Sequence, residues 1–203
     1  TAPGELVVNG WSPSKRNNPF ANSGMVVSVE EKDALQYLKS KKLKGNIQSL
    51  ETHPLLMMYF QQAVEQKAFA AGGGKFAAPA QRMVDLFERK TSSTLPDCSY
   101  VPGLNAVNLD QVLPSFIFDS LRLGFQTFGK KMRGYFTNEA VAVATESRTS
   151  SPVRIPRNPD TLEHVQVKKL YPCAEGAGYA GGIVSAAMDG EKIADKIAAV
   201  LKA

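Results

Sequence analysis

The sequence predicts an α+β protein with short β-strands near both ends and a helical middle. Two observations carry this prediction. Short runs rich in β-branched residues lie near both ends, and apolar residues recur at helical spacing between them. The 203 residues are 43% hydrophobic and 21% charged, an ordinary composition for a chain that buries a sizeable core.

Two strands are expected near the amino end. Residues 5–9 (ELVVN) are rich in β-formers and flanked by glycines, and residues 25–29 (MVVSV) form a second such run. The polar loop between them has no period and contains two adjacent cations, Lys15 and Arg16. Two interpretations of this loop stay open: a plain connection, or a segment that faces an anionic ligand.

Helical periodicity dominates the middle of the chain. Apolar residues on one face predict helices over residues 31–41, 54–70, 77–90 and 114–132. Between the last two, residues 91–109 are rich in Ser, Pro, Asp and Gly and show little periodicity, which indicates a loop.

Strand character returns near the carboxyl end. Alternating valines predict a strand over residues 139–146, and a short apolar run predicts another over residues 170–174. We expect these two strands to share a sheet, so that their carboxyl ends meet at one crevice. Three arginines and four hydroxyl side chains lie within residues 146–157, where forked donors can hold an anion or a polar ring edge, although such residues also form ordinary turns. The expected meeting of the two strand ends favours a binding site.

A glycine-rich turn precedes the last helix. After Glu175 come Gly176, Gly178, Gly181 and Gly182, and then a segment with helical periodicity. Small residues on its apolar stripe predict close packing against a sheet. Glycines let a ligand approach the main chain, and the N–H groups of a first helical turn favour phosphate. Spacing alone leaves phosphate binding and a purely structural turn equally open.

The net charge of +5 raises the question of nucleic-acid binding. The densest basic segment, residues 39–44, ends a predicted helix and contains no aromatic residue for base stacking. We therefore interpret it as a solvated helix end, and nucleic acid is not expected as a partner.

Other features narrow the class of protein. Cys98 and Cys173 occur without a CxxC pattern, so neither a disulfide framework nor a metal site is predicted, and a reducing cytoplasm is the expected location. The apolar runs fall short of the ~20 residues that span a bilayer. The amino end has neither an initiator Met nor a signal region, which predicts a segment of a longer protein.

Several long strings of residues carry a family resemblance. Residues 146–155 (ESRTSSPVRI) and 170–190 (LYPCAEGAGYAGGIVSAAMDG) resemble the carboxyl-terminal half of bacterial FAD-dependent, NAD(FAD)-utilising dehydrogenases. Residues 68–85 and the loop that ends at residues 22–24 are also similar to that family. The resemblance implies a partial FAD/NAD(P)-binding-type fold, in which a late turn and helix close over the flavin cofactor.

The resemblance also implies site residues. The cofactor-binding residues would be Glu175, Gly176, Ala177, Gly178, Gly181, Gly182, Ile183 and Val184. The residues near the flavin or the substrate would be Glu146, Arg148, Ser150, Ser151 and Arg154. Arg148 and Arg154 would hold an anionic substrate group. No residue emerges as a catalytic acid, base or nucleophile, because His53 and His164 have no obvious partner in the sequence.

One expected element of such a flavoprotein is absent: no GxGxxG pattern follows a strand, and the triple glycine 72–74 follows a helix. We therefore expect a substrate-domain β segment (1–29), a helical subdomain (30–137) and the closing strands and helix of an FAD domain (138–203). The partner would be the amino-terminal FAD-binding portion of the parent chain. The parent would be an oxidoreductase that uses FAD, with NAD(P)H as a further candidate, and the isolated chain would be inactive. The alternative is a non-enzymatic interaction module with a structural turn.

Overall fold

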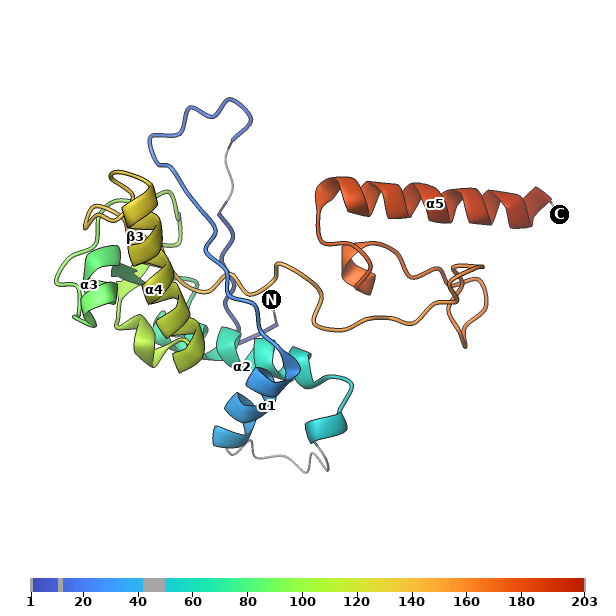
Figure 1. Cartoon of the computed structure of the whole chain (residues 1–203), viewed down its shortest axis with the longest axis horizontal. Coiled ribbons are helices and arrows are strands. Elements are labelled where there is room, and N and C mark those ends of the chain that lie inside the picture. The colour runs from blue at the N-terminus through green and yellow to red at the C-terminus, as the bar shows by residue number, and fades with distance from the viewer. Residues whose placement is uncertain (1, 11–12, 42–49, 203) are drawn as a thin grey trace. The chain divides into compact units, whose positions relative to one another are not determined.

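The computed structural model describes residues 2–10, 13–41 and 50–202 (Figure 1). The described residues form five α-helices, three 3-10 helices and a three-stranded sheet, which confirms the α+β class. The chain divides into two compact units. The first comprises Thr1–Asn46 and Tyr59–Ser147, and the second comprises Ile47–Met58 and Arg148–Ala203.

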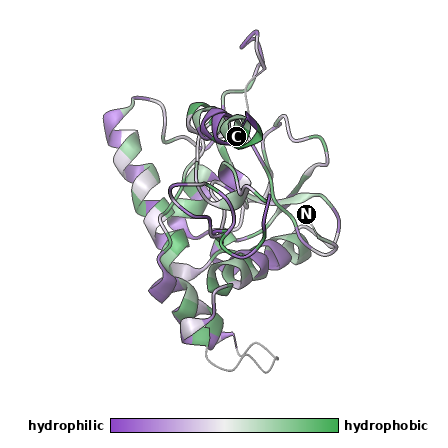
Figure 2. Ribbon diagram, turned by 90° about the vertical axis from the view of Figure 1, so that its right-hand side faces the viewer, coloured by the Kyte–Doolittle hydropathy of each residue, from purple (hydrophilic) through white to green (hydrophobic). Residues whose placement is uncertain are grey.

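Three of the predicted helices of the middle segment are confirmed. They are α1 (Glu31–Ser40), α2 (Leu56–Ala71) and α4 (Ser115–Lys131). Figure 2 shows hydrophilic and hydrophobic residues side by side along the helices, as expected for helices with one buried face. The carboxylate of Asp33 accepts the N–H of Glu30 at 3.0 Å and so caps the start of α1.

The basic segment 39–44 lies partly outside the described residues, because the description stops at Lys41 and resumes at residue 50. Lys39 lies in the last turn of α1, where its positive charge suits the carboxyl end of the helix.

The predicted helix over residues 77–90 is wrong in its first half. Residues Ala78–Arg82 form strand β1, and only Met83–Glu88 form a helix, α3. Pro79 explains the difference, because proline lacks an N–H donor and restricts the residue before it to extended conformations. Strand β1 lies in the centre of the sheet, and its Ala78 and Ala80 are fully buried.

The sheet has the strand order β2-β1-β3. Strand β2 (Leu104–Ala106) lies in the segment expected to be a loop and pairs with β1 in parallel. Strand β3 (Val141–Val143) lies within the predicted strand 139–146 but is shorter, and it pairs with β1 in antiparallel orientation.

The two predicted strands of the amino end are wrong, because the structure assigns no strand to residues 5–9 or 25–29. The first segment is tied down by single main-chain bonds instead. The N–H of Leu6 donates to the carbonyl of Glu65 at 3.1 Å, and the N–H of Val8 donates to the carbonyl of Thr145 at 2.9 Å.

The main core lies in the first unit, between the sheet, α3 and α4. Its buried members are Leu6, Val8, Ala68, Ala78, Met83, Leu86, Leu109, Val112, Leu113, Phe118, Phe125 and Ala144. Gln81 is a buried polar residue beside this core: its amide donates to the carbonyl of Lys90 at 2.7 Å and accepts the N–H of Leu109 at 2.9 Å.

The second unit contains the 3-10 turn Glu175–Ala177 and the last helix, α5 (Ile183–Lys202). The predicted helix is confirmed, but the predicted strand over residues 170–174 is wrong, and so is its expected pairing with residues 139–146. Among the described residues, no helix is long and apolar enough to cross a membrane.

The sheet lies in the first unit and α5 in the second, so the expected packing of α5 against a sheet stays a prediction. Within the described part of the chain, Ile193 is the buried residue of this helix. Ile183, Val184, Met188, Val200 and Leu201 are exposed. The helix contacts loop segments of its own unit through Asp189, as described below.

Candidate functional site

The structure divides the predicted site residues between the two units. Glu146 belongs to the first unit, where its Oε1 accepts a hydrogen bond from the side-chain amide of Asn9 at 3.0 Å. The remaining predicted residues, Arg148, Ser150, Ser151, Arg154 and residues 175–184, belong to the second unit.

The glycine-rich turn is a compact, hydrogen-bonded structure. Ala174 has a positive φ of 55°, and Gly178 has a left-handed φ of 81°. The N–H of Gly178 donates to the carbonyl of Glu175, and the N–H of Tyr179 donates to the carbonyl of Ala174, both at 2.9 Å. These hydrogen bonds fix the backbone conformation of residues 174–179, just before the start of α5.

The turn packs against the arginine-rich segment, residues 148–157. The N–H of Ile155 donates to the carbonyl of Ala177 at 3.1 Å, and Nε of Arg154 donates to the carbonyl of Gly178 at 3.0 Å. Ser151 has a local role, because its hydroxyl donates to the carbonyl of Val153 at 2.7 Å. Ser150 and Arg148 are exposed.

Tyr179 links the turn to two arginines. The guanidinium of Arg157 lies 3.7 Å from the centre of the tyrosine ring, and that of Arg154 lies 5.0 Å from it. The phenol hydroxyl donates to the carbonyl of Ile155 at 3.0 Å and accepts the N–H of Arg157 at 3.1 Å. Tyr179 therefore contacts Arg154, Ile155 and Arg157 and holds the arginine-rich segment beside the turn.

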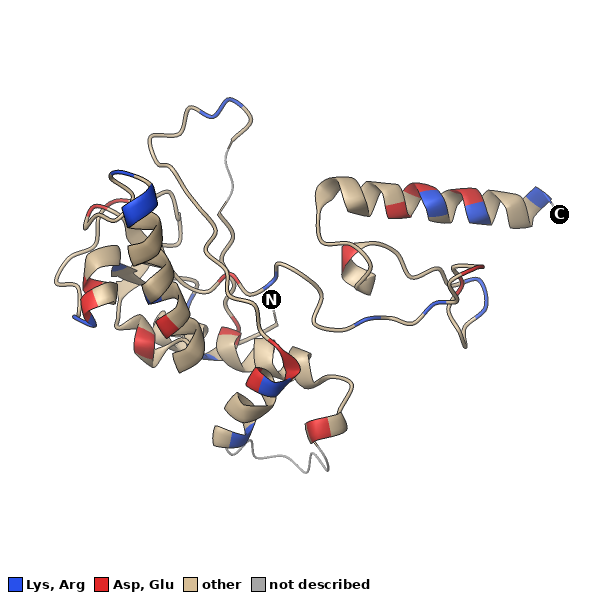
Figure 3. Cartoon of the chain, in the orientation of Figure 1, with Lys and Arg blue, Asp and Glu red and all other residues tan. Residues whose placement is uncertain are grey.

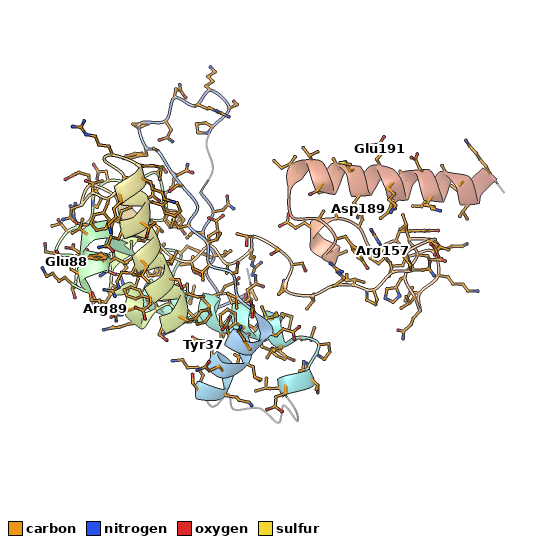
Figure 4. All side chains as sticks on the ribbon, viewed as in Figure 1. Tyr37, Glu88, Arg89, Arg157, Asp189 and Glu191 are labelled. Carbon is orange, nitrogen blue, oxygen red and sulfur yellow. The ribbon has the colours of Figure 1, made fainter. Side chains whose placement is uncertain are left out.

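An ion pair between Arg157 and Asp189 holds α5 to the loops before it (Figure 4). Nη1 of Arg157 donates to Oδ2 of Asp189 at 2.9 Å, and Nη2 donates to Oδ1 at 2.7 Å. Their side chains are only 8% and 12% exposed. Nη1 also donates to the carbonyl of Pro172 at 2.8 Å, and Oδ2 accepts the N–H of Ala174 at 2.9 Å.

The electrostatics of this pair follow from its geometry. The hydrogen bonds from Arg157 lower the pKa of the Asp189 carboxyl from 3.8 to about 2, against burial, which acts to raise it. The N–H of Ala174 lowers that pKa further. The same pairing raises the pKa of Arg157. Both groups are therefore charged throughout the physiological range.

The amino end of α5 offers donors to an anion. Helix geometry leaves the first N–H groups, including those of Ile183 and Val184, without an acceptor inside the helix. The Ser185 hydroxyl accepts one further N–H, that of Gly182, at 3.1 Å. Ile183 is 92% exposed, and a Cβ atom on Gly181 would meet no atom within 4 Å. A phosphate group could thus approach this main chain closely.

The charge distribution also suits an anion at this end. The first turn of α5 contains no acidic residue, and the start of the helix is tan in Figure 3, the colour of residues that are neither acidic nor basic. The acidic residue that precedes the helix is Glu175, on the turn, and Asp189 is the first acidic residue within the helix. The residues present therefore fit the pyrophosphate of a dinucleotide cofactor at the level of main-chain donors and open space.

Other candidate chemistry finds no support. Nδ1 of His164 accepts the N–H groups of Gln166 and Val167 at 3.1 and 3.0 Å, which is a structural role. Nδ1 of His53 accepts the N–H of Leu55 just before α2, which is also a structural role. Among the described residues, no three His, Cys, Asp or Glu side chains gather as metal ligands would.

Sequence reasoning missed Asp189, Arg157 and Tyr179 as a group. One signal was available for Asp189: it lies three residues after Ala186 and four before Ile193, so it shares the inward face of α5 rather than the charged face. An acidic residue on such a face needs a cation as partner. The sequence does not show which of the nearby arginines supplies it.

Comparison with known proteins adds the family. Residues 1–149 match the model of the family described as "FAD-dependent protein, C-terminal domain-like". An uncharacterised protein of Clostridium beijerinckii is 40% identical over 196 residues, which cover 96% of this chain. The matched segment spans 34% of that relative's length. The family match ends before the glycine-rich turn, whereas the similarity to the relative covers nearly the whole chain.

Proposed function

The chain belongs to the family of C-terminal domains of FAD-dependent proteins, and we propose that it supplies the substrate-side part of an FAD-dependent oxidoreductase. In this proposal, residues 175–184 form the closing turn and helix start of the flavin site. The comparisons name FAD and do not mention a nicotinamide cofactor. The observation that carries the proposal is the open, uncharged amino end of α5 after a hydrogen-bonded glycine turn.

Each group of residues has a distinct proposed task. Gly181 and Gly182 leave space for the cofactor, and the N–H groups of Ile183 and Val184 donate to its phosphate oxygens. Gly176 and Gly178, with Glu175 and Ala177, shape the turn. Arg148 and Arg154 attract an anionic group of the substrate or flavin, and Ser150 and Ser151 belong to the same segment. Bound FAD would supply the hydride chemistry at its ring.

We further propose that a longer protein covers the exposed apolar residues of α5. Ile183, Val184 and Met188 are more than half exposed. Exposed apolar side chains gathered on one helix are typical of a surface that another part of a protein covers. Since the matched segment is about a third of the relative's length, the FAD-binding portion of the longer protein is the proposed occupant.

Flavin content of the full-length protein tests the proposal. We expect a yellow protein that retains FAD on purification, and loss of flavin when Gly181 or Gly182 is changed to Val, because the new side chain fills the space for the cofactor. Gly190→Ala serves as control, since it lies outside the turn and meets no atom within 4 Å. A colourless full-length protein that takes up no FAD would show that the proposal is wrong.

The isolated chain is a second test. In this proposal, a further portion of the longer protein supplies about half of the cofactor contacts, so we expect no tight FAD binding by the chain alone. Stoichiometric, tight binding in a fluorescence titration would contradict this expectation. The non-enzymatic alternative predicts that neither the isolated chain nor the full-length protein binds flavin.

A further inference from the structure

The Arg157–Asp189 pair reaches both ends of the glycine-rich turn. On the amino-terminal side, Arg157 binds the carbonyl of Pro172 and Asp189 binds the N–H of Ala174. On the carboxyl-terminal side, the guanidinium of Arg157 stacks on Tyr179, whose N–H donates to the carbonyl of Ala174. Residues 175–178 thus lie between two segments that this one ion pair holds.

The geometry of the Arg157–Asp189 pair suits a positioning role. A forked, nearly buried pair with two parallel bonds fixes both the distance and the orientation of its elements. Because Asp189 neutralises Arg157, the arginine has little charge left to attract a separate anion. Removing either partner would leave the other charge buried without compensation, which makes the arrangement sensitive to single substitutions.

We propose that Arg157 and Asp189 are positioning residues that hold the turn and the amino end of α5 in the geometry that receives the cofactor's pyrophosphate. This inference rests on the proposed function. The pair touches no cofactor atom itself; it acts through Ala174, Tyr179 and the helix axis. The amino end of α5 supplies the donors, and the ion pair sets their orientation.

The chain offers a matched control on the same helix. Glu191 lies two residues after Asp189, is exposed, and projects from the opposite side of α5 in Figure 4. Asp189→Asn and Glu191→Gln each remove one negative charge from α5, at positions only two residues apart along the helix. They differ in whether the carboxylate is part of the ion pair.

The first readout is FAD affinity in the full-length protein, measured by flavin fluorescence or absorbance after removal and return of the cofactor. We expect Asp189→Asn to raise the dissociation constant about tenfold or more, which corresponds to about 1.4 kcal/mol. Glu191→Gln should leave it unchanged. Arg157→Lys keeps the charge but loses the fork, so we expect it to weaken FAD binding as well.

The second readout needs no cofactor and separates this inference from the proposed function. In the 203-residue chain, amide hydrogen exchange reports the N–H groups of Ile155, Gly178 and Tyr179, none of which bonds to Asp189. We expect exchange at these amides to be at least tenfold faster in Asp189→Asn and Arg157→Lys than in the wild type and in Glu191→Gln.

The outcomes are distinct. If the wild-type protein binds no FAD but the three amides respond as expected, the flavin assignment fails and the positioning role of the pair stands. If Asp189→Asn and Arg157→Lys leave both the amide exchange and the FAD affinity unchanged, the positioning role is wrong. Far-UV circular dichroism shows whether each variant keeps its helices. If either Asp189→Asn or Arg157→Lys unfolds, the amide exchange and FAD affinity of the other variant test the positioning role.

Discussion

The main chain at Gly178 lies so close to Val153 that a Cβ atom there would stand 2.8 Å from the Val153 carbonyl oxygen. The same atom would lie 3.0 Å from Cα of Arg154, and the backbone at Gly178 has a left-handed φ of 81°. Both the space and the conformation at this position therefore require glycine. The contact joins the turn to the arginine-rich segment.

Gly178→Ala should destabilise the second unit by about 1–3 kcal/mol, since alanine brings both backbone strain and a clash with backbone atoms. Gly176→Ala is the matched control: a Cβ atom there meets nothing within 4 Å, and its φ is not positive. We expect the control to stay within about 0.5 kcal/mol of the wild type. Thermal unfolding of the chain measures both, and equal effects would contradict the assigned contact.

Gly72→Ala should destabilise the first unit by about 3 kcal/mol, because a Cβ atom on Gly72 would lie 1.9 Å from the carbonyl oxygen of Ala77. The opposite result is expected for Gly190→Ala within α5, where no atom lies within 4 Å. Alanine favours helix over glycine, so this variant should gain about 0.5–1 kcal/mol. Urea unfolding measures both; a stable Gly72→Ala chain would show that residues 72–77 pack differently.

Asp189 should make the second unit sensitive to acid. The pKa of Asp189 is about 2 in the folded chain and lies near 3.8 without its partners. The ionised carboxylate therefore adds its full contribution to the free energy of unfolding above pH 4. That stabilisation, on the order of 2 kcal/mol at most, is lost as the pH falls from 4 toward 2. Asp189→Asn should flatten this part of a stability profile measured by thermal unfolding against pH. A profile unchanged by the substitution would argue against the ion pair.

Gln81→Leu should cost about 1–3 kcal/mol, because it leaves the buried N–H of Leu109 and the carbonyl of Lys90 without their partner. Gln111→Leu, at an exposed position of the nearby 3-10 helix Leu109–Gln111, is the control and should change little. Chemical denaturation of the two variants compares them directly, and equal stability would contradict the buried network.

The exposed apolar residues of α5 should contribute to stability only in the longer protein. Ile183 is 92% exposed and Met188 is 64% exposed in this chain, so Ile183→Ser and Met188→Ser should leave its stability within about 0.5 kcal/mol. If the FAD-binding portion covers them, each substitution should cost about 1.5–3 kcal/mol in the full-length protein. Melting temperatures of both forms test this, and equal effects in the two would contradict the proposed contact.

Periodicity predicted the helices well because a helix is a local structure. The pattern of apolar residues alone located α1, α2, α4 and α5 to within a few residues. The strands were harder, since a strand exists only where a partner pairs with it. Residues 5–9 have the composition of a strand, yet Leu6 and Val8 bond to single carbonyls of Glu65 and Thr145. Conversely, β1 contains Pro79 and lacks strand composition, but lies between two partners.

By itself, the sequence determined the α+β class, the helix that begins after Gly182, and the glycine turn before it, because these depend on short-range spacing and backbone freedom. Only the tertiary structure decided that residues 170–174 form no strand and that Asp189 faces Arg157. The reason is physical: which carboxylate meets which guanidinium depends on how loops distant in sequence pack together, and no local pattern encodes that choice.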